Sequence, residues 1–307
     1  MKISLSIIAI ISFFNLNYSA ENTRKSPITS YSVSPNETDI NYSENQNKHY
    51  IVQNNKQQLG KLVLFIGGSG SDPKNYNLIC DFNAKLGFDV ISLSYLNSVP
   101  AGALANSFDN LIFDNYREEI CFGTQISQNV NVDSLNSIAT RTLKLLTFLS
   151  QKYPSQNWKN YLRNTNTINW DKITVAGHSQ GAGHACYLAK KNSVERVVMF
   201  AGPNDYNTNL KASANWLSVN GKTSLNNYYA LLHEKDEIIK YEYQVSNLRS
   251  LGLLIGDDQP YLANKIMNSF GSAHVISVKI KGLSYHNCVV GKNKTLAKIW
   301  TYMFTGN

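Results

Sequence analysis

One serine in this sequence is placed to do covalent chemistry. Ser179 is the centre of residues 177–181, which read Gly-His-Ser-Gln-Gly. In a strand-to-helix turn, this G-x-S-x-G pattern holds a serine hydroxyl clear of its surroundings. The preceding run 173–176 is rich in β-branched residues, and the segment after the serine favours a helix. We therefore expect a strand, a sharp turn and a helix, with Ser179 as a nucleophile at the turn.

A histidine near the end of the chain is the expected partner of Ser179. A serine hydroxyl is a poor nucleophile near neutral pH, so an imidazole must take its proton and a carboxylate must orient that imidazole. His286 lies in a loop past the last expected strand, from which it can reach over the carboxyl edge of a sheet. His184 lies on the expected helix and should point away from Ser179, whereas His274 opens a strand, so the sheet fixes its side chain. His178, on the sharp turn itself, is expected to be structural or pocket-lining. We therefore favour His286 as the general base.

The acid should also follow a strand. The expected strand 228–232 is followed by His-Glu-Lys-Asp-Glu at 233–237, which offers Asp236, and Asp236 is our choice. Asp205 follows the preceding strand and remains an alternative acid. Glu234 and Glu237 are weaker candidates, because charged turn residues are common on solvated loops. We expect Asp236→Asn to reduce turnover far more than Asp205→Asn.

Attack on a carbonyl also requires two N–H donors for the oxygen that becomes negative. The residue after the nucleophile, Gln180, supplies one donor in this kind of turn. The apolar run 62–66 leads straight into Gly-Gly-Ser-Gly at 67–70, so the N–H of Ser69 is the expected second donor. This loop lacks the third glycine or the Gly-Lys-Ser/Thr ending of a phosphate-binding loop, so nucleotide binding is not expected.

Metal and cofactor sites are not indicated. His233 and Glu234 are adjacent, but the second histidine of an H-E-x-x-H zinc motif is missing. No C-x-x-C spacing occurs, so neither a zinc knuckle nor a redox dithiol is expected. We expect at most one disulfide, with Cys186 a small buried residue, among the four cysteines Cys80, Cys121, Cys186 and Cys288.

The elements that must position these residues alternate between apolar runs and helical patterns from residue 49 onward. This alternation predicts an α/β fold with a mostly parallel central sheet and helices on both faces. The segments 133–149 and 296–303 carry apolar stripes at helical spacing, which we interpret as core. The expected strands are 50–53, 62–66, 88–93, 173–176, 196–200, 228–232 and 275–280.

The chain begins with the pattern of an export signal. A lysine precedes an apolar run of about 14 residues that ends at small residues, so residues 1–20 are expected to be a cleaved signal peptide. That run is shorter than the ~20 residues needed to span a bilayer, so no stable membrane span is expected. We expect a secreted or periplasmic protein with a polar extension at 21–48 and one catalytic domain at 49–307.

The net charge of +8 is spread along the 307 residues. Because there is no basic run and no nucleic-acid motif, a solvated basic surface is favoured over nucleic-acid binding.

With its 177–184 and 67–70 segments, the chain resembles the α/β-hydrolase superfamily, and in particular its exported bacterial esterase and lipase-like members. The resemblance covers residue 49 to the C-terminus. It implies Ser179, Asp236 and His286 as a catalytic triad, and Ser69 with Gln180 as the oxyanion hole. The chain departs from many relatives in having Gly67 where they place His or Pro.

The resemblance implies a carboxylic ester hydrolase that forms an acyl-serine intermediate with a small-molecule or lipid-like ester. A serine peptidase or acyltransferase on the same fold is the first alternative, and a non-catalytic binding protein is the second. Two insertions, 94–133 and 202–227, lie where caps form in this fold. They carry aromatic residues that could line an acyl pocket: Tyr116, Phe122, Tyr206 and Trp216.

Overall fold

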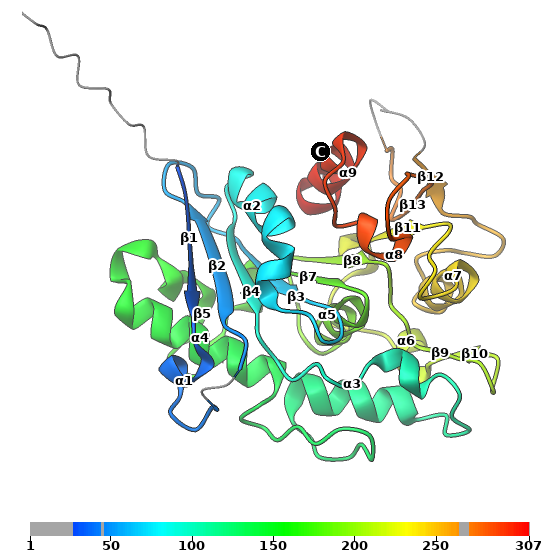
Figure 1. The fold of residues 1–307 in the computed structure, drawn as a ribbon, viewed down its shortest axis with the longest axis horizontal. Coiled ribbons are helices and arrows are strands. Elements are labelled where there is room, and N and C mark those ends of the chain that lie inside the picture. Colours follow the sequence, from blue (N-terminus) through cyan, green and yellow to red (C-terminus); the bar gives the residue numbers. More distant parts are fainter. Residues whose placement is uncertain (1–26, 44–45, 264–269, 307) are drawn as a thin grey trace, which may run out of the picture.

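The structure is a computed structural model that describes residues 27–43, 46–263 and 270–306 (Figure 1). The expected signal peptide, residues 1–20, lies outside the described residues. Within the described part, nine strands form one sheet in the order β1 (Ile28–Val33), β2 (His49–Asn54), β4 (Asp89–Leu93), β3 (Leu62–Ile66), β7 (Ile173–His178), β8 (Arg196–Phe200), β11 (Tyr228–His233), β13 (Val275–Val278) and β12 (Tyr261–Leu262).

The sheet is mostly parallel, as expected. Every neighbouring pair from β4 to β12 in this order is parallel, whereas β1 pairs antiparallel with β2 and β2 pairs antiparallel with β4. The central strands are continuous apolar runs because both of their faces are covered. In β3, for example, every side chain is at most 1% exposed.

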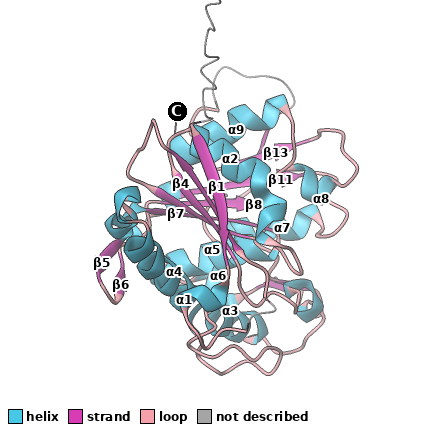
Figure 2. Ribbon diagram, turned by 60° about the vertical axis from the view of Figure 1, so that its left-hand side comes forward, coloured by secondary structure: helices cyan, strands magenta, loops and turns pink. Residues whose placement is uncertain are grey.

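Helices cover both faces of the sheet (Figure 2). On one face lie α2 (Asn77–Lys85) and α9 (Lys294–Thr305), which share a core with alternate residues of β3 such as Val63 and Phe65. The other residues of β3 face a second core. That core is shared with α3 (Ile112–Phe122), α4 (Ile138–Lys152), α5 (Gln180–Lys191) and α7 (Tyr241–Ser250).

The remaining elements are short. The short helices are α1 (Pro35–Thr38), α6 (Asn215–Ser218) and α8 (Tyr285–Cys288). The small hairpins are β5 (Leu162–Asn164) with β6 (Thr167–Ile168), and β9 (Tyr206–Asn207) with β10 (Ala212–Ser213). No helix among the described residues combines the length and apolar character that crossing a bilayer requires.

Two of the expected segments differ from the structure by more than two residues. The sheet begins earlier than residue 49, because 28–33, expected within a polar extension, pair along their whole length with β2. The helix expected at 133–149 begins at 138 and extends to 152. Its start is set by Ser137, whose hydroxyl accepts a hydrogen bond from the Thr140 N–H at 3.2 Å as an N-cap.

The parallel strands β3, β7, β8, β11 and β13 end at the same edge of the sheet. The segments that follow these strands carry Ser69, Ser179, Asp205, Asp236 and, on α8, His286. The fold therefore gathers every candidate site residue at one edge, where open α/β sheets bind their ligands.

Candidate active site

The backbone at Ser179 has the expected strand–turn–helix form. β7 ends at His178 and α5 begins at Gln180, and Ser179 between them has φ 57° and ψ −123°. A non-glycine residue with positive φ is strained, so the surroundings must hold it in place. The Ser179 N–H donates to the Phe200 carbonyl at 2.8 Å, and its carbonyl accepts from the Ala182 N–H at 3.0 Å. These hydrogen bonds to β8 and α5 thus hold Ser179 in its strained conformation.

Both glycines of the pattern are needed for close approach. A Cβ atom on Gly177 would lie 2.1 Å from the carbonyl oxygen of Gly181. A Cβ atom on Gly181 would lie 2.0 Å from the carbonyl oxygen of Ile66. The end of β3 therefore packs directly against the first turn of α5. This contact brings the 67–70 loop up to the serine.

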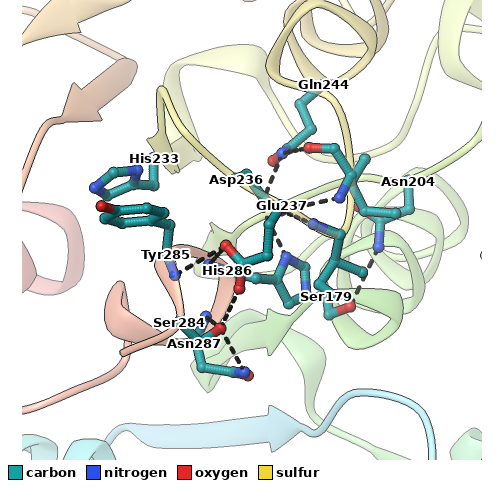
Figure 3. A network of polar contacts seen from close by, with 12 residues as sticks. Ser179, Asn204, His233, Asp236, Glu237, Gln244, Ser284, Tyr285, His286 and Asn287 are labelled. Carbon is teal, nitrogen blue, oxygen red and sulfur yellow. Dashed lines mark hydrogen bonds and ion pairs between the residues drawn. The ribbon is translucent and has the colours of Figure 1, made fainter. Parts of the chain in front are cut away.

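Asp236 and His286 lie together at this edge (Figure 3). His286 Nδ1 is 2.8 Å from Asp236 Oδ2, and both side chains are at most 5% exposed. The N–H groups of Ile238 and Ile239 donate to Asp236 Oδ1, each at 2.9 Å. Gln244 Nε2 donates to Oδ2 at 3.0 Å. The carboxylate therefore accepts four hydrogen bonds.

These contacts determine the charge of Asp236. Burial acts to raise the pKa of the Asp236 carboxyl, as it does for any carboxyl taken out of water. The hydrogen bond from His286, the positive charge that this ring carries when protonated, and the two backbone N–H groups outweigh burial and hold that pKa below its usual value. Asp236 is therefore ionised at neutral pH and can orient the imidazole of His286.

Glu237 fixes the backbone that carries His286. Its Oε2 accepts from the N–H of Tyr285 at 2.9 Å and from the N–H of His286 at 3.1 Å, and its Oε1 accepts from the Ser284 hydroxyl. The sequence ranked Glu237 low as an acid. The structure gives it a different role, holding the first turn of α8.

The hydroxyl of Ser179 contacts a residue that the sequence did not single out. Asn204 Nδ2 donates to Ser179 Oγ at 3.3 Å (Figure 3). Among the residues that the structure describes, no hydrogen bond joins Ser179 Oγ to His286. Such nucleophile–base bonds commonly become short only in the substrate complex. Asn204 follows β8, so its position just past a strand was the signal that could have found it.

The two residues expected to supply the oxyanion donors, Ser69 and Gln180, are joined by a hydrogen bond between their side chains. Ser69 Oγ donates to Gln180 Oε1 at 2.7 Å, and the Ala101 N–H donates to the same oxygen at 3.1 Å. Gln180 is the first residue of α5, where backbone N–H groups have no partner within the helix and the helix dipole is positive. A Cβ atom on Gly68 would lie 3.3 Å from Ser179 Cβ, so the loop approaches the serine closely.

Asp205, the alternative acid, lies in a buried ion pair instead. Arg117 donates from Nε to Asp205 Oδ2 at 2.9 Å and from Nη2 to Oδ1, and neither side chain is exposed. Trp216 Nε1 also donates to Oδ2, at 2.8 Å. Arg117 Nη1 reaches the carbonyl oxygen of Gln180 at 2.8 Å. Asp205 therefore holds Arg117 in contact with Gln180, the first residue of α5. In the described residues Asp205 makes no hydrogen bond to a histidine.

The two insertions contribute to the core more than to a cap. Tyr116 is fully buried and its hydroxyl donates to the Val99 carbonyl at 2.8 Å. Trp216 is 4% exposed and is held by Asp205. Only Phe122 and Tyr206, of the four aromatic residues expected to line a pocket, are partly exposed.

The remaining histidines serve the scaffold. His184 packs between Tyr95 and Tyr116 in the core. His233 Nε2 lies 2.8 Å from the Ile280 carbonyl, and His274 Nδ1 lies 2.8 Å from the Tyr228 carbonyl.

The cysteines are unpaired in this structure, and Cys186 is fully buried as expected. In the described part of the chain, no group of three or more His, Cys, Asp or Glu side chains is placed to hold a metal ion.

The mostly parallel sheet with helices on both faces, and the strand–turn–helix at Ser179, confirm the expected fold class, an α/β-hydrolase fold. No protein-family model and no curated protein matches the chain.

Several solved structures are similar in fold. A truncated carbohydrate esterase from gut microbiota has 11% identity and a TM-score of 0.49, over 91% of this chain and 97% of that one. A bacterial heroin esterase has 11% identity and a TM-score of 0.45, over 91% and 83%. Esterase B from Lactobacillus rhamnosis has 12% identity and a TM-score of 0.41, over 74% and 71%. At such identities the likeness concerns the fold alone, so the function of this chain must be argued from its own site.

Proposed function

We propose that this protein is a serine hydrolase that cleaves carboxylic esters through an acyl-serine intermediate. In this proposal Ser179 is the nucleophile, His286 the general base and Asp236 the acid that orients it. The observation that carries the proposal is the 2.8 Å contact between His286 Nδ1 and a buried, ionised Asp236, on the edge of the sheet where Ser179 occupies its strained turn.

The hydrogen bond to Asp236 sets the tautomer of His286. Because an ionised carboxylate only accepts, His286 Nδ1 carries the hydrogen and Nε2 has a free lone pair. Nε2 can then take the proton of Ser179 as Oγ attacks the ester carbonyl. The nearby negative charge stabilises the imidazolium that forms.

The reaction then follows the two halves of acyl transfer. The C=O bond becomes a C–O⁻ in the tetrahedral intermediate, which collapses to acyl-serine as the imidazolium gives its proton to the departing alkoxide. Water repeats the sequence, with His286 as base, and releases the carboxylic acid and Ser179. The N–H groups of Ser69 and Gln180 are the proposed donors to the oxyanion, and one such donor is worth about 3 kcal/mol of barrier.

The proposal extends to location. The pattern of residues 1–20 supports export, so we propose a secreted or periplasmic enzyme whose mature chain begins near residue 21. N-terminal sequencing of the protein recovered from the medium and from the periplasm tests this point.

The nucleophile is tested with a fluorophosphonate probe and intact-mass measurement of wild type and Ser179→Ala. We expect one adduct on the wild type, none on the variant, and the same unfolding midpoint for both. A folded wild type without an adduct, or a variant that hydrolyses at the wild-type rate, would refute the assignment.

The substrate class is tested with p-nitrophenyl acetate and butyrate beside peptide p-nitroanilides. Release of nitrophenol without release of nitroaniline supports an esterase. The opposite result supports the peptidase alternative, and ester turnover that rises with an added alcohol while acid release falls supports an acyltransferase.

A further inference from the structure

A buried chain of hydrogen bonds connects the loop of the proposed oxyanion donors to the loop of the proposed base. The Gly68 N–H donates to Tyr76 Oη at 2.8 Å. Tyr76 Oη lies 3.2 Å from His178 Nδ1, and His178 Nε2 lies 3.0 Å from the carbonyl oxygen of His286. Tyr76, His178 and His286 are each at most 8% exposed, so water does not compete for these bonds.

The donors and acceptors allow only one direction along this chain. The carbonyl of His286 can only accept, so His178 Nε2 carries a hydrogen. Burial is the main cause that lowers the pKa of His178 to about 3, so the ring is neutral and Nδ1 is an acceptor. The Tyr76 hydroxyl must therefore donate to Nδ1, and its oxygen is free to accept from Gly68.

We propose that Tyr76 and His178 are positioning residues that hold the proposed oxyanion loop and the proposed base in register with Ser179. The inference rests on the function proposed above. His178 is the last residue of the buried strand β7 and directly precedes the nucleophile, so the chain is anchored at the serine itself.

At one end of the chain, Gly68 directly precedes Ser69, whose N–H is a proposed oxyanion donor. A Cβ atom on Gly68 would lie 3.3 Å from Ser179 Cβ. The Tyr76 hydroxyl thus holds the backbone at a point where the loop passes close to the nucleophile. A shift of Gly68 would move the Ser69 N–H with it.

At the other end, the chain holds the backbone of the base. α8 is only four residues long, so it contributes little rigidity of its own. Glu237 accepts a hydrogen bond from the N–H of His286, and His178 donates one to the carbonyl of His286. These two contacts fix both backbone polar groups of His286, the residue whose ring must face Ser179.

The hydroxyl of Tyr76 can be tested apart from its ring. The ring packs on Phe65 with centroids 4.8 Å apart, and that contact survives in Tyr76→Phe. With p-nitrophenyl acetate we expect this variant to lose roughly 10- to 100-fold in kcat with KM within about 2-fold, because small displacements of catalytic groups have effects of this size. Tyr161→Phe is the matched control. The buried hydroxyl of Tyr161 donates to Asp89, the first residue of β4, at the amino ends of the parallel strands and away from the site. We expect the control to keep the wild-type kcat.

His178 is tested by conservative rescue. His178→Gln can keep a donor toward the His286 carbonyl, whereas His178→Leu cannot. We expect the Gln variant to retain at least about 5-fold more kcat than the Leu variant, at a temperature where urea unfolding shows both to be folded.

Different outcomes would refute the proposed hydrolase function and the positioning role of Tyr76 and His178. A wild type that takes up no fluorophosphonate refutes the proposed function. A wild type that is labelled and hydrolyses ester, beside a folded Tyr76→Phe with unchanged kcat or a Gln variant no better than Leu, refutes the positioning role alone.

Discussion

Replacing Asp236 with asparagine keeps the shape of the side chain but puts an amide NH₂ among four hydrogen-bond donors. Two of these, the N–H groups of Ile238 and Ile239, face Oδ1, and the other two, from His286 and Gln244, face Oδ2. Whichever way the amide turns, its nitrogen meets two donors. The least costly adjustment is for His286 to shift its proton from Nδ1 to Nε2 and accept at Nδ1.

That shift removes the lone pair that takes the proton of Ser179 in the proposed mechanism. An imidazole in the wrong tautomer lowers kcat by about 10⁴-fold in serine triads. At 1.36 kcal/mol per factor of ten, this is about 5.5 kcal/mol of barrier. We expect Asp236→Asn to show a loss of this size while remaining folded.

Asp205→Asn provides the contrast. It breaks the fully buried pair with Arg117, and removing one partner of such a pair costs about 3–5 kcal/mol of stability. We expect a lower urea midpoint and, in protein that remains folded, a kcat within about 10-fold of wild type.

The assay is p-nitrophenyl acetate hydrolysis beside urea unfolding for both variants. A folded Asp236→Asn that retains more than a tenth of kcat, together with a folded Asp205→Asn that is inactive, would refute the assignment of the acid.

Two further changes test the scaffold. A Cβ atom on Gly183 would lie 2.2 Å from Arg117 Nη2, so Gly183→Ala should lower the free energy of unfolding by about 1–3 kcal/mol in urea titrations, and an unchanged value would contradict the tight packing of α3 on α5. Asp114 is half-buried, and burial raises its pKa to about 6 from a value near 4 in the unfolded chain. The folded state therefore binds the proton more tightly, and stability falls as pH rises from about 4 to about 6. Allowing for solvent screening, we expect Asp114→Asn to add about 1 kcal/mol at pH 8 and nothing at pH 4, and equal effects at both pH values would contradict this reading.

The strands that could be predicted are those whose own residues require burial. β3 and β8 have the expected bounds, because continuous apolar runs leave no other place for these residues. β1 reads Ile-Thr-Ser-Tyr-Ser-Val and has too little apolar character to be recognised locally. β1 forms because it pairs with β2, and a pairing between two separate segments cannot be predicted from either segment alone.

The residues of the candidate site likewise fall into those that the sequence predicts and those that it does not. Ser179 directly follows β7, and Asp236 and His286 lie in the segments after β11 and β13, so topology brings all three to the same edge of the sheet. Arg117 and Tyr76 act through contacts with residues far away in the chain, 88 residues in the pair with Asp205 and 102 in the pair with His178. No local pattern marks them, because an arginine or a tyrosine in a helical segment is usually an ordinary surface or core residue.

The two ends of the sheet also bear on how copies of this protein meet one another. An edge strand with free N–H and C=O groups can recruit a strand from a second chain and begin aggregation. Here one edge is β1, four of whose six residues are Ser, Thr or Tyr, and the other described edge is β12, only two residues long. β1 covers β2, whose six residues are all buried, and the Tyr31 hydroxyl bonds to Gln156 at 2.8 Å to hold it there. The outermost strand thus shields the buried strand β2, and it presents a mostly polar edge in place of an apolar one.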